Sequence, residues 1–129
     1  QGGSKNIFTG KYKAAEKYFP KTYFSPKKLG DTYIAKPIWG RQGQGCFIVR
    51  DGKNTTQSRY QHEYYVNQAK VYQELLTIPK IPVEGKPLNW VYESWVYKVG
   101  RKFVPGRTGL RGCNSEITDD FCYFMPIGV

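Results

Sequence analysis

The stretch from residue 36 to residue 45 constrains the fold more than any other part of the chain. It reads KPIWGRQGQG, with an apolar run ending at Ala35 before it and another beginning at Cys46 after it. Three glycines in six positions let the backbone adopt positive φ angles and approach a ligand closely. Because the turn signal Asp51-Gly52 follows the second run, the pattern predicts two strands joined by a glycine-rich loop, with no helix after the loop.

The composition of this loop favours an anion site. Successive backbone N–H groups in such a turn can form a concave binding site for an anion, and Lys36 and Arg41 add positive charge beside it. The pattern G-x-x-x-x-G-K-[ST] is absent, so the loop is not a Walker A loop. Kinase-type glycine loops cover phosphates with a similar arrangement. A hairpin tip with two solvated cations explains the same residues, and both interpretations stay open at this stage.

Net charge narrows the classes of partner. The 129 residues, enough for one domain by length, carry 20 Lys and Arg against 10 Asp and Glu, a formal charge of +10. This excess favours an anionic partner, which can be a nucleotide, a nucleic acid or an acidic surface. No apolar run approaches the roughly 20 residues that a membrane-spanning helix needs, so no membrane association is expected.

The cysteines favour a reducing compartment. There are three, Cys46, Cys113 and Cys122, with no C-x-x-C pair and only one histidine, His62, which argues against a zinc site. An odd number of cysteines without secretory features predicts a cytoplasmic protein. Cys46 and Cys122 are expected to be small core residues.

Strand signals outnumber helix signals along the chain. Strands are expected at residues 31–39, 45–50, 90–99 and 121–125, with residues 102–104 pairing back on the long strand as a hairpin, and residues 71–76 form a short apolar run. Residues 51–57, 79–87 and 105–114 are expected to be loops because they are polar or rich in proline and glycine. Residues 59–70 fit either a helix or a strand. The whole predicts an α+β fold, mainly antiparallel sheet with one or two helices.

The N-terminal part is expected to differ from the rest. Residues 1–4 read as a cloning remnant, and the absence of an initiator Met indicates a piece of a longer protein. Residues 5–30 form a basic segment with a short helix at residues 12–19. Thr9 is its candidate N-cap, and Pro20 is expected to end it.

Several short motifs occur in a fixed order along the chain. They are Lys36-Pro37, Gly40-Arg41-Gln42-Gly43, Tyr72-Gln73-Glu74-Leu75, Ile78-Pro79, Glu93-Ser94-Trp95-Val96, Gly109-Leu110-Arg111, Ile117-Thr118 and Phe124-Met125-Pro126. In this order they resemble the carboxy-terminal part of the glutathionylspermidine synthase family, which are ligases of the ATP-grasp type. The resemblance covers roughly three quarters of the chain.

The resemblance implies an ATP-dependent carboxylate–amine ligase, in which a carboxylate is activated as an acyl phosphate and an amine then attacks it. Residues 31–129 would form an ATP-grasp-like nucleotide-binding unit that uses ATP and Mg²⁺. Lys36 would contact the nucleotide phosphates, and Arg111 would be the catalytic arginine that steadies the transferring phosphoryl charge. The implied lid over the phosphates contains Gly40, Arg41, Gly43 and Gly45, and the implied adenine-side segment is Gln73, Glu74 and Leu75.

The chain also departs from the family pattern. The family's magnesium carboxylates precede the Lys-Pro strand, and no matching acidic set precedes Lys36 here. Glu93 and Glu116 are weak candidates, because lone carboxylates rarely hold Mg²⁺. Ile127 stands where the family has His, and Gln42 where it commonly has Glu. The resemblance therefore implies an incomplete ligase site that a second chain or an upstream segment would complete.

Two other readings fit the same sequence. A basic nucleic-acid-binding module without catalysis is the alternative function, because 11 Tyr, 7 Phe and 3 Trp accompany the positive charge. A structural domain, in which the glycine loop only turns a hairpin, is the third.

Overall fold

The computed structural model describes residues 13–127 of the chain. The chain divides into two compact units, Gln1–Thr77 and Ile78–Val129. The boundary between them falls inside the unit expected at residues 31–129. Residues 1–4 and the expected cap Thr9 lie outside the described residues.

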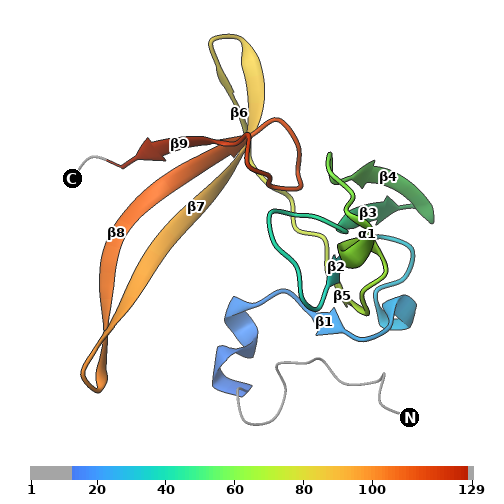
Figure 1. Ribbon diagram of the computed structural model, residues 1–129, viewed down its shortest axis with the longest axis horizontal. Coiled ribbons are helices and arrows are strands. Elements are labelled where there is room, and N and C mark those ends of the chain that lie inside the picture. Colours follow the sequence, from blue (N-terminus) through green and yellow to red (C-terminus); the bar gives the residue numbers. More distant parts are fainter. Residues whose placement is uncertain (1–12, 128–129) are drawn as a thin grey trace. The chain divides into compact units, whose positions relative to one another are not determined.

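The first unit is built around one antiparallel sheet (Figure 1). Its strands are β1 (Thr22–Tyr23), β2 (Tyr33–Pro37), β3 (Phe47–Arg50), β4 (Lys53–Gln57) and β5 (Lys70–Gln73), in the order β1-β5-β2-β3-β4. Ala35 and Ile48, at the centre of the sheet, are fully buried. The predicted pair of strands around the glycine loop is confirmed as β2 and β3, in which Ile34 pairs with Ile48.

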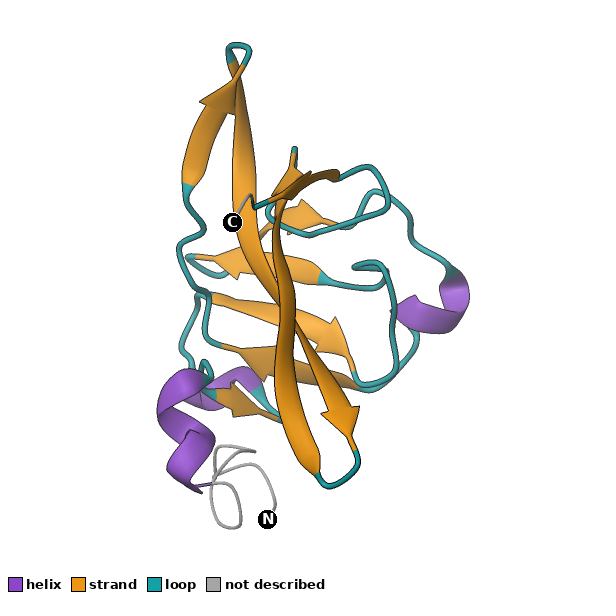
Figure 2. Cartoon of the chain, turned by 90° about the vertical axis from the view of Figure 1, so that its left-hand side faces the viewer, coloured by secondary structure: helices purple, strands orange, loops and turns teal. Residues whose placement is uncertain are grey.

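Helices are few and short in the described part of the chain (Figure 2). The helix expected at residues 12–19 is a 3-10 helix, Lys13–Tyr18, and a second 3-10 helix covers Pro26–Lys28. The ambiguous stretch at residues 59–70 contains α1 (Glu63–Val66). His62 caps this helix, because its Nδ1 accepts from the Tyr64 N–H at 3.2 Å.

The second unit is a four-stranded antiparallel sheet with strands in sequence order. These are β6 (Lys80–Val83), β7 (Lys86–Val99), β8 (Lys102–Cys113) and β9 (Tyr123–Pro126). The long pair β7 and β8 twists as a ribbon (Figure 1). Trp90 packs against Gly112, where a Cβ would come within 2.8 Å of the indole ring. The prediction of a mainly antiparallel fold with few helices is confirmed.

Three expected loops are strands instead. Residues 53–57 form β4, residues 80–83 form β6, and residues 105–113 continue β8. Pro82 is tolerated in β6 because β6 is an edge strand. Proline has no backbone N–H, and on the outer side of an edge strand no hydrogen bond to a neighbouring strand is lost. Pro105 of β8 pairs with Val96 of β7. The β7–β8 register shifts between Ser94 and Val96, and this irregularity next to Pro105 accommodates the proline.

The expectation that Cys122 is a small core residue is confirmed, but its sulfur is not a free thiol. Cys122 is buried, but it forms a disulfide with Cys113. Gly112 pairs with Tyr123, so one further step along the same register places Cys113 opposite Cys122. This register is set by the β8–β9 turn and cannot be read from the spacing of the two cysteines. Cys46 is free and half-buried.

Candidate functional site

Lys36 is the central residue of the candidate site in the first unit. The β2–β5 register pairs Lys36 with Val71 and Ile34 with Gln73, so Lys36 and Gln73 lie diagonally on one face of the sheet. The Lys36 ammonium donates to Gln73 Oε1 at 2.6 Å. Gln73 Nε2 in turn donates to Thr22 Oγ1 at 2.9 Å. A polar chain across β2, β5 and β1 therefore fixes the ammonium group.

The environment of Lys36 disfavours its positive charge. Burial lowers the pKa of Lys36 from its ordinary value, and the nearby Cys46 thiol opposes this shift. Burial likewise raises the pKa of Cys46, and the cations of Lys36 and Lys70 oppose that change. An anion beside Lys36 would favour the charged ammonium and replace part of the hydration that it has lost.

The glycine loop, residues 38–46, is ordered by two tight turns. Gln44 N–H donates to the Arg41 carbonyl at 3.0 Å, and the two residues between them, Gln42 and Gly43, both have positive φ. Cys46 N–H donates to the Gly43 carbonyl at 3.0 Å. The amides of Gln44 and Cys46 are thus used inside the loop and do not serve as anion donors.

The glycine loop and Lys36 line one cavity of about 220 Å³. Its walls include Gly40, Arg41, Gly43 and Cys46 besides Lys36. Arg41 is exposed, and its Nε–H donates to Gln42 Oε1 at 3.0 Å. The cavity therefore joins one half-buried cation and one exposed cation under a glycine-rich backbone, which is a donor set suited to phosphate oxygens.

The expected adenine-side residues continue β5. Glu74 N–H donates to the Lys21 carbonyl at 2.8 Å, and Lys21 N–H donates to Glu74 Oε2 at 3.3 Å. The backbone N–H of Glu74 is therefore already used in a hydrogen bond to the Lys21 carbonyl and is not open to an adenine ring. Gln73 contacts Lys36, whereas Leu75 is half-buried beyond the end of the strand.

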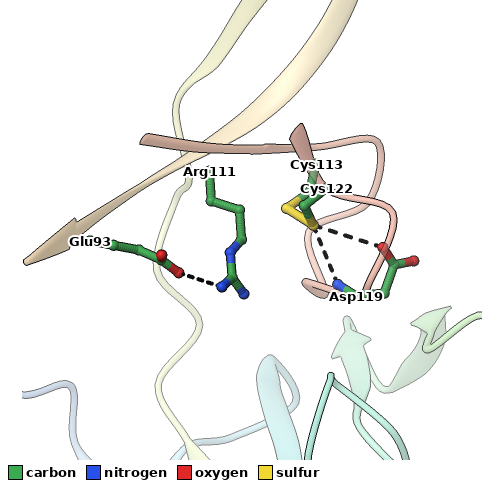
Figure 3. Close-up of polar contacts among 5 residues, drawn as sticks. All are labelled: Glu93, Arg111, Cys113, Asp119 and Cys122. Carbon is green, nitrogen blue, oxygen red and sulfur yellow. Dashed lines mark hydrogen bonds and ion pairs between the residues drawn. A yellow bond between two sulfur atoms is a disulfide. The ribbon is translucent and has the colours of Figure 1, made fainter. Parts of the chain in front are cut away.

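Arg111 lies in the second unit, on β8. Its Nη2 forms an ion pair of 2.8 Å with Glu93 Oε1 (Figure 3). Its Cζ lies 4.5 Å from the centre of the Phe124 ring. Both charged side chains are partly accessible, with 27% of Arg111 and 25% of Glu93 exposed. Glu93, a weak candidate for a Mg²⁺ ligand, is thus paired with an arginine. The described residues contain no group of three His, Cys, Asp or Glu side chains that could hold a metal ion.

The structure brings Lys36, Gln73 and the glycine loop together in one unit, and it places Arg111 with Glu93 in the other. Thr22 and Phe124 were not expected as site residues. Thr22 lies two residues after Pro20, and its link to Gln73 spans 51 residues of sequence. Phe124 belongs to a recognised motif, but its contact with Arg111 depends on the β8–β9 register.

A comparison with protein families places the chain. A family profile described as glutathionylspermidine synthase preATP-grasp matches residues 8–129. The fold and the family profile together identify this protein as a ligase-associated segment built mostly from antiparallel strands. The chain belongs to the glutathionylspermidine synthase family, which confirms the resemblance carried by its motifs. No curated protein matches the chain, and the described residues include no helix long and apolar enough to cross a membrane.

Proposed function

We propose that this chain is the ATP- or ADP-binding portion of an ATP-dependent carboxylate–amine ligase. The observation that carries the proposal is Lys36, a half-buried cation held by Gln73 on the wall of the glycine-loop cavity. A buried ammonium that has lost hydration interacts more strongly with a phosphate than a solvated surface lysine does. The family membership supports a role in ATP-dependent amide-bond formation.

Each part of the cavity has a role in this proposal. Lys36 supplies a fixed point charge for the phosphates, and Arg41 adds an exposed planar donor from the loop. The glycines let the loop approach the phosphates closely and exclude water, which would otherwise hydrolyse an acyl phosphate. Arg111 lies outside this cavity, in the second unit. It keeps the role that the family resemblance implies, in which its permanently charged guanidinium would steady the transferring phosphoryl group.

Magnesium is the part of the family chemistry that the described residues do not fit. They contain no cluster of carboxylate, His or Cys side chains for a metal, and Glu93 is paired with Arg111. The proposal therefore routes no step through Mg²⁺. It assigns the metal ligands, and the rest of the acid and amine sites, to a second chain or to a segment beyond the described residues.

Calorimetric titration with ATP and ADP tests the proposal. We expect Lys36→Met to weaken binding roughly tenfold or more, because a charge-assisted hydrogen bond is lost. Lys53→Met is the matched control, since Lys53 is exposed on the edge strand β4 and its replacement removes the same charge. Equal binding by the two variants, or no saturable binding by the natural chain, would contradict the proposal.

The titration also carries a pH dependence with a definite sign. Because burial lowers the pKa of Lys36, part of this group is deprotonated at alkaline pH. A bound phosphate favours the charged form, so binding takes up a proton in that range and affinity falls as pH rises through the free-state pKa. Titrations in two buffers of different ionisation enthalpy measure this uptake. Lys36→Met should abolish the uptake, and Lys53→Met should retain it.

One observation favours the alternative, a nucleic-acid-binding module. The β7–β8 ribbon, residues 94–108, exposes the rings of Trp95, Tyr97 and Phe103. Four cations, Lys98, Arg101, Lys102 and Arg107, lie in the same ribbon, which contains no acidic residue. Exposed rings and cations are the groups on which single-stranded nucleic acid stacks and neutralises its charge.

A further inference from the structure

We propose that the outer edge of β7 is a docking site for an extended segment of a partner protein in which apolar and acidic side chains alternate. The segment would add a strand to the second sheet, beside β7. The site lies entirely in the second unit and is independent of the glycine-loop cavity. It is formed by residues 92–98, here called the free edge, and by the side chains that flank them.

The backbone of the free edge is open to a new strand. β6 pairs with β7 only at Lys86–Asn89, and the Trp90 N–H then donates to the Pro79 carbonyl at 3.0 Å. Because backbone groups point alternately to the two edges of a strand, Trp90 shows which residues face outward. Beyond Trp90, where no strand of residues 13–127 lies beside β7 on this edge, the outward-facing residues are Tyr92, Ser94, Val96 and Lys98. Figure 1 shows the long pair β7 and β8 continuing past β6 to its turn.

The outer edge of β8 is less suited to strand addition. Pro105 has no N–H to offer a neighbouring strand. The register also shifts beside it, since two steps along β7, from Ser94 to Val96, correspond to three along β8. A proline and an extra residue both interrupt the row of donors and acceptors that a new strand needs. β7 contains no proline in the free edge, so the pair is open on its β7 side.

One face beside the free edge is apolar. It carries Trp95, Tyr97 and Val99, whose exposed fractions are 57%, 56% and 63%. The Tyr97 ring leans toward β8 and away from the free edge, because a Cβ built on Gly106 of β8 would clash with it. Apolar side chains of an added strand would cover these exposed groups and remove them from water.

The opposite face favours acidic side chains. Tyr92, Ser94 and Lys98 are exposed and supply two hydroxyl donors and one ammonium, with Val96 between them. Glu93 is the acidic residue of β7, but it points to the other face and is held in an ion pair of 2.8 Å. Carboxylates of an added strand would therefore meet hydrogen-bond donors and a cation on this face.

Charge selects an acidic partner over a second copy of the chain. The ribbon of residues 94–108 contains no acidic residue, and its cations are Lys98, Arg101, Lys102 and Arg107. Two such ribbons side by side would bring like charges together, which is unfavourable. Residues 1–12 and 128–129 also lack acidic residues, so they do not supply the segment. A nucleic acid would match the charge, but it cannot continue the hydrogen-bond ladder of the sheet.

Hydrogen–deuterium exchange of the full chain, followed residue by residue by NMR, tests strand addition. The probe is a capped peptide of about eight residues, a common strand length, in which valine and glutamate alternate. We expect it to slow exchange about tenfold at the outward amides of the free edge. Exchange at Glu93 and Tyr97 should not change, because their amides already face β8. Attraction between charges alone does not produce this alternation.

Matched peptides separate geometry from charge. A peptide with the same residues in two blocks, all valines and then all glutamates, should slow no amide, because it cannot present one apolar and one acidic face. Two further peptides keep the alternating sequence and carry N-methyl groups, on the valines in one and on the glutamates in the other. Only one of the two should bind, because an added strand turns alternate amides toward β7.

A pair of charge variants tests the role of Lys98. Lys98→Glu should weaken binding of the alternating peptide about fivefold, because an attraction becomes a repulsion. Lys53→Glu is the control, since it makes the same change of net charge on β4 of the first unit, and it should have little effect. Equal weakening by the two variants would show that the peptide responds only to the total charge of the chain.

The other occupants of this edge give distinct results. Exchange at the free edge that slows as the chain alone is concentrated would show pairing with a second copy. An oligothymidylate that displaces the peptide, while neither slows the outward amides, would show a surface for nucleic acid. Either result would overturn the inference, as would equal binding of the alternating and block peptides or the absence of saturable binding.

Discussion

Gly45 anchors the glycine loop, although the tip of the loop at Arg41 and Gln42 is exposed. Gly45 is buried with φ +70°, and a Cβ built on it would lie 2.5 Å from the Tyr65 carbonyl oxygen and 2.8 Å from Pro37 Cγ. Glycine is therefore required twice at this position, once by the backbone angle and once by the close packing against the carbonyl of a residue in α1. The loop has an exposed tip on a fixed base.

Replacement of Gly45 by alanine should separate these two requirements. Gly52 has nearly the same angle, φ +72°, but no atom of the described residues lies within 4 Å of a Cβ built there. We expect Gly52→Ala to cost about 1 kcal/mol of unfolding free energy from the backbone angle alone. Gly45→Ala should cost about 3 kcal/mol, because the steric clash adds to the angle. Urea unfolding measures both, and equal costs would disprove close packing at Gly45.

At the residue scale, the sequence predicts features formed by residues close together in the chain, but it does not predict contacts between residues far apart. The spacing of the glycines and the Lys36-Pro37 pair lie within ten residues, and the structure places them around one cavity. The partner of Lys36 is Gln73, which is 37 residues away and is brought near by the β2–β5 pairing. The Arg111–Glu93 pair likewise depends on the β7–β8 register, which the sequence does not specify.

At the scale of elements, β9 is the strand most dependent on a covalent link. Within residues 13–127 it pairs with β8 alone, and it is exposed along its whole length. The disulfide between Cys113 and Cys122 joins the end of β8 to the segment just before β9, and the Asp119 N–H donates to Cys122 Sγ at 3.4 Å (Figure 3). Because Phe124 lies on β9, the same link keeps the ring against Arg111.

Removal of this disulfide should destabilise the second unit. The chain-entropy model assigns about 2 to 3 kcal/mol to a bridge that closes a loop of this size, since the two cysteines are 9 residues apart. We expect the double variant Cys113→Ala/Cys122→Ala to lose that amount in urea unfolding followed by tryptophan fluorescence, to which Trp90, packed on Gly112, contributes. Cys46→Ala is the control for an isolated cysteine. Unfolding of the natural chain that does not respond to a reductant would contradict the expectation.

Element prediction succeeded where apolar residues alternate and failed where composition resembled a loop. The expected strands at residues 31–39 and 90–99 correspond to β2 and β7. By contrast, β4 is polar and β6 contains a proline, and both are edge strands that need little burial on one side. The glycines of β8 are typical of a loop, but here Gly112 leaves room for Trp90 and Gly106 leaves room for Tyr97. Such packing between neighbouring strands cannot be seen in one strand's sequence.

At the scale of the whole molecule, the formal charge of +10 attracts any polyanion. The two candidate functions differ in where the binding energy resides. A nucleotide site concentrates it on a few groups such as Lys36 and the glycine loop, whereas a nucleic-acid surface spreads it over many cations. Affinity alone therefore does not distinguish them, but the response to salt and to single substitutions does.

A salt titration with ATP and with a single-stranded oligothymidylate separates the two functions. For the oligonucleotide we expect weak binding that fades steeply with salt, with a slope that falls by about 0.7 for each cation removed from the β7–β8 ribbon. Lys98→Ala and Lys102→Ala should each lower the slope by this small amount. Lys36→Met should lower the slope by no more than a ribbon variant does, because half-buried Lys36 faces the glycine-loop cavity. For ATP the order should be reversed, with a large loss in Lys36→Met and little change in the ribbon variants. The opposite result would be oligonucleotide binding that is tighter than ATP binding at about 0.15 M salt and is abolished by Trp95→Ala. It would establish the ribbon as the binding surface, because salt does not screen the stacking of bases on an exposed ring.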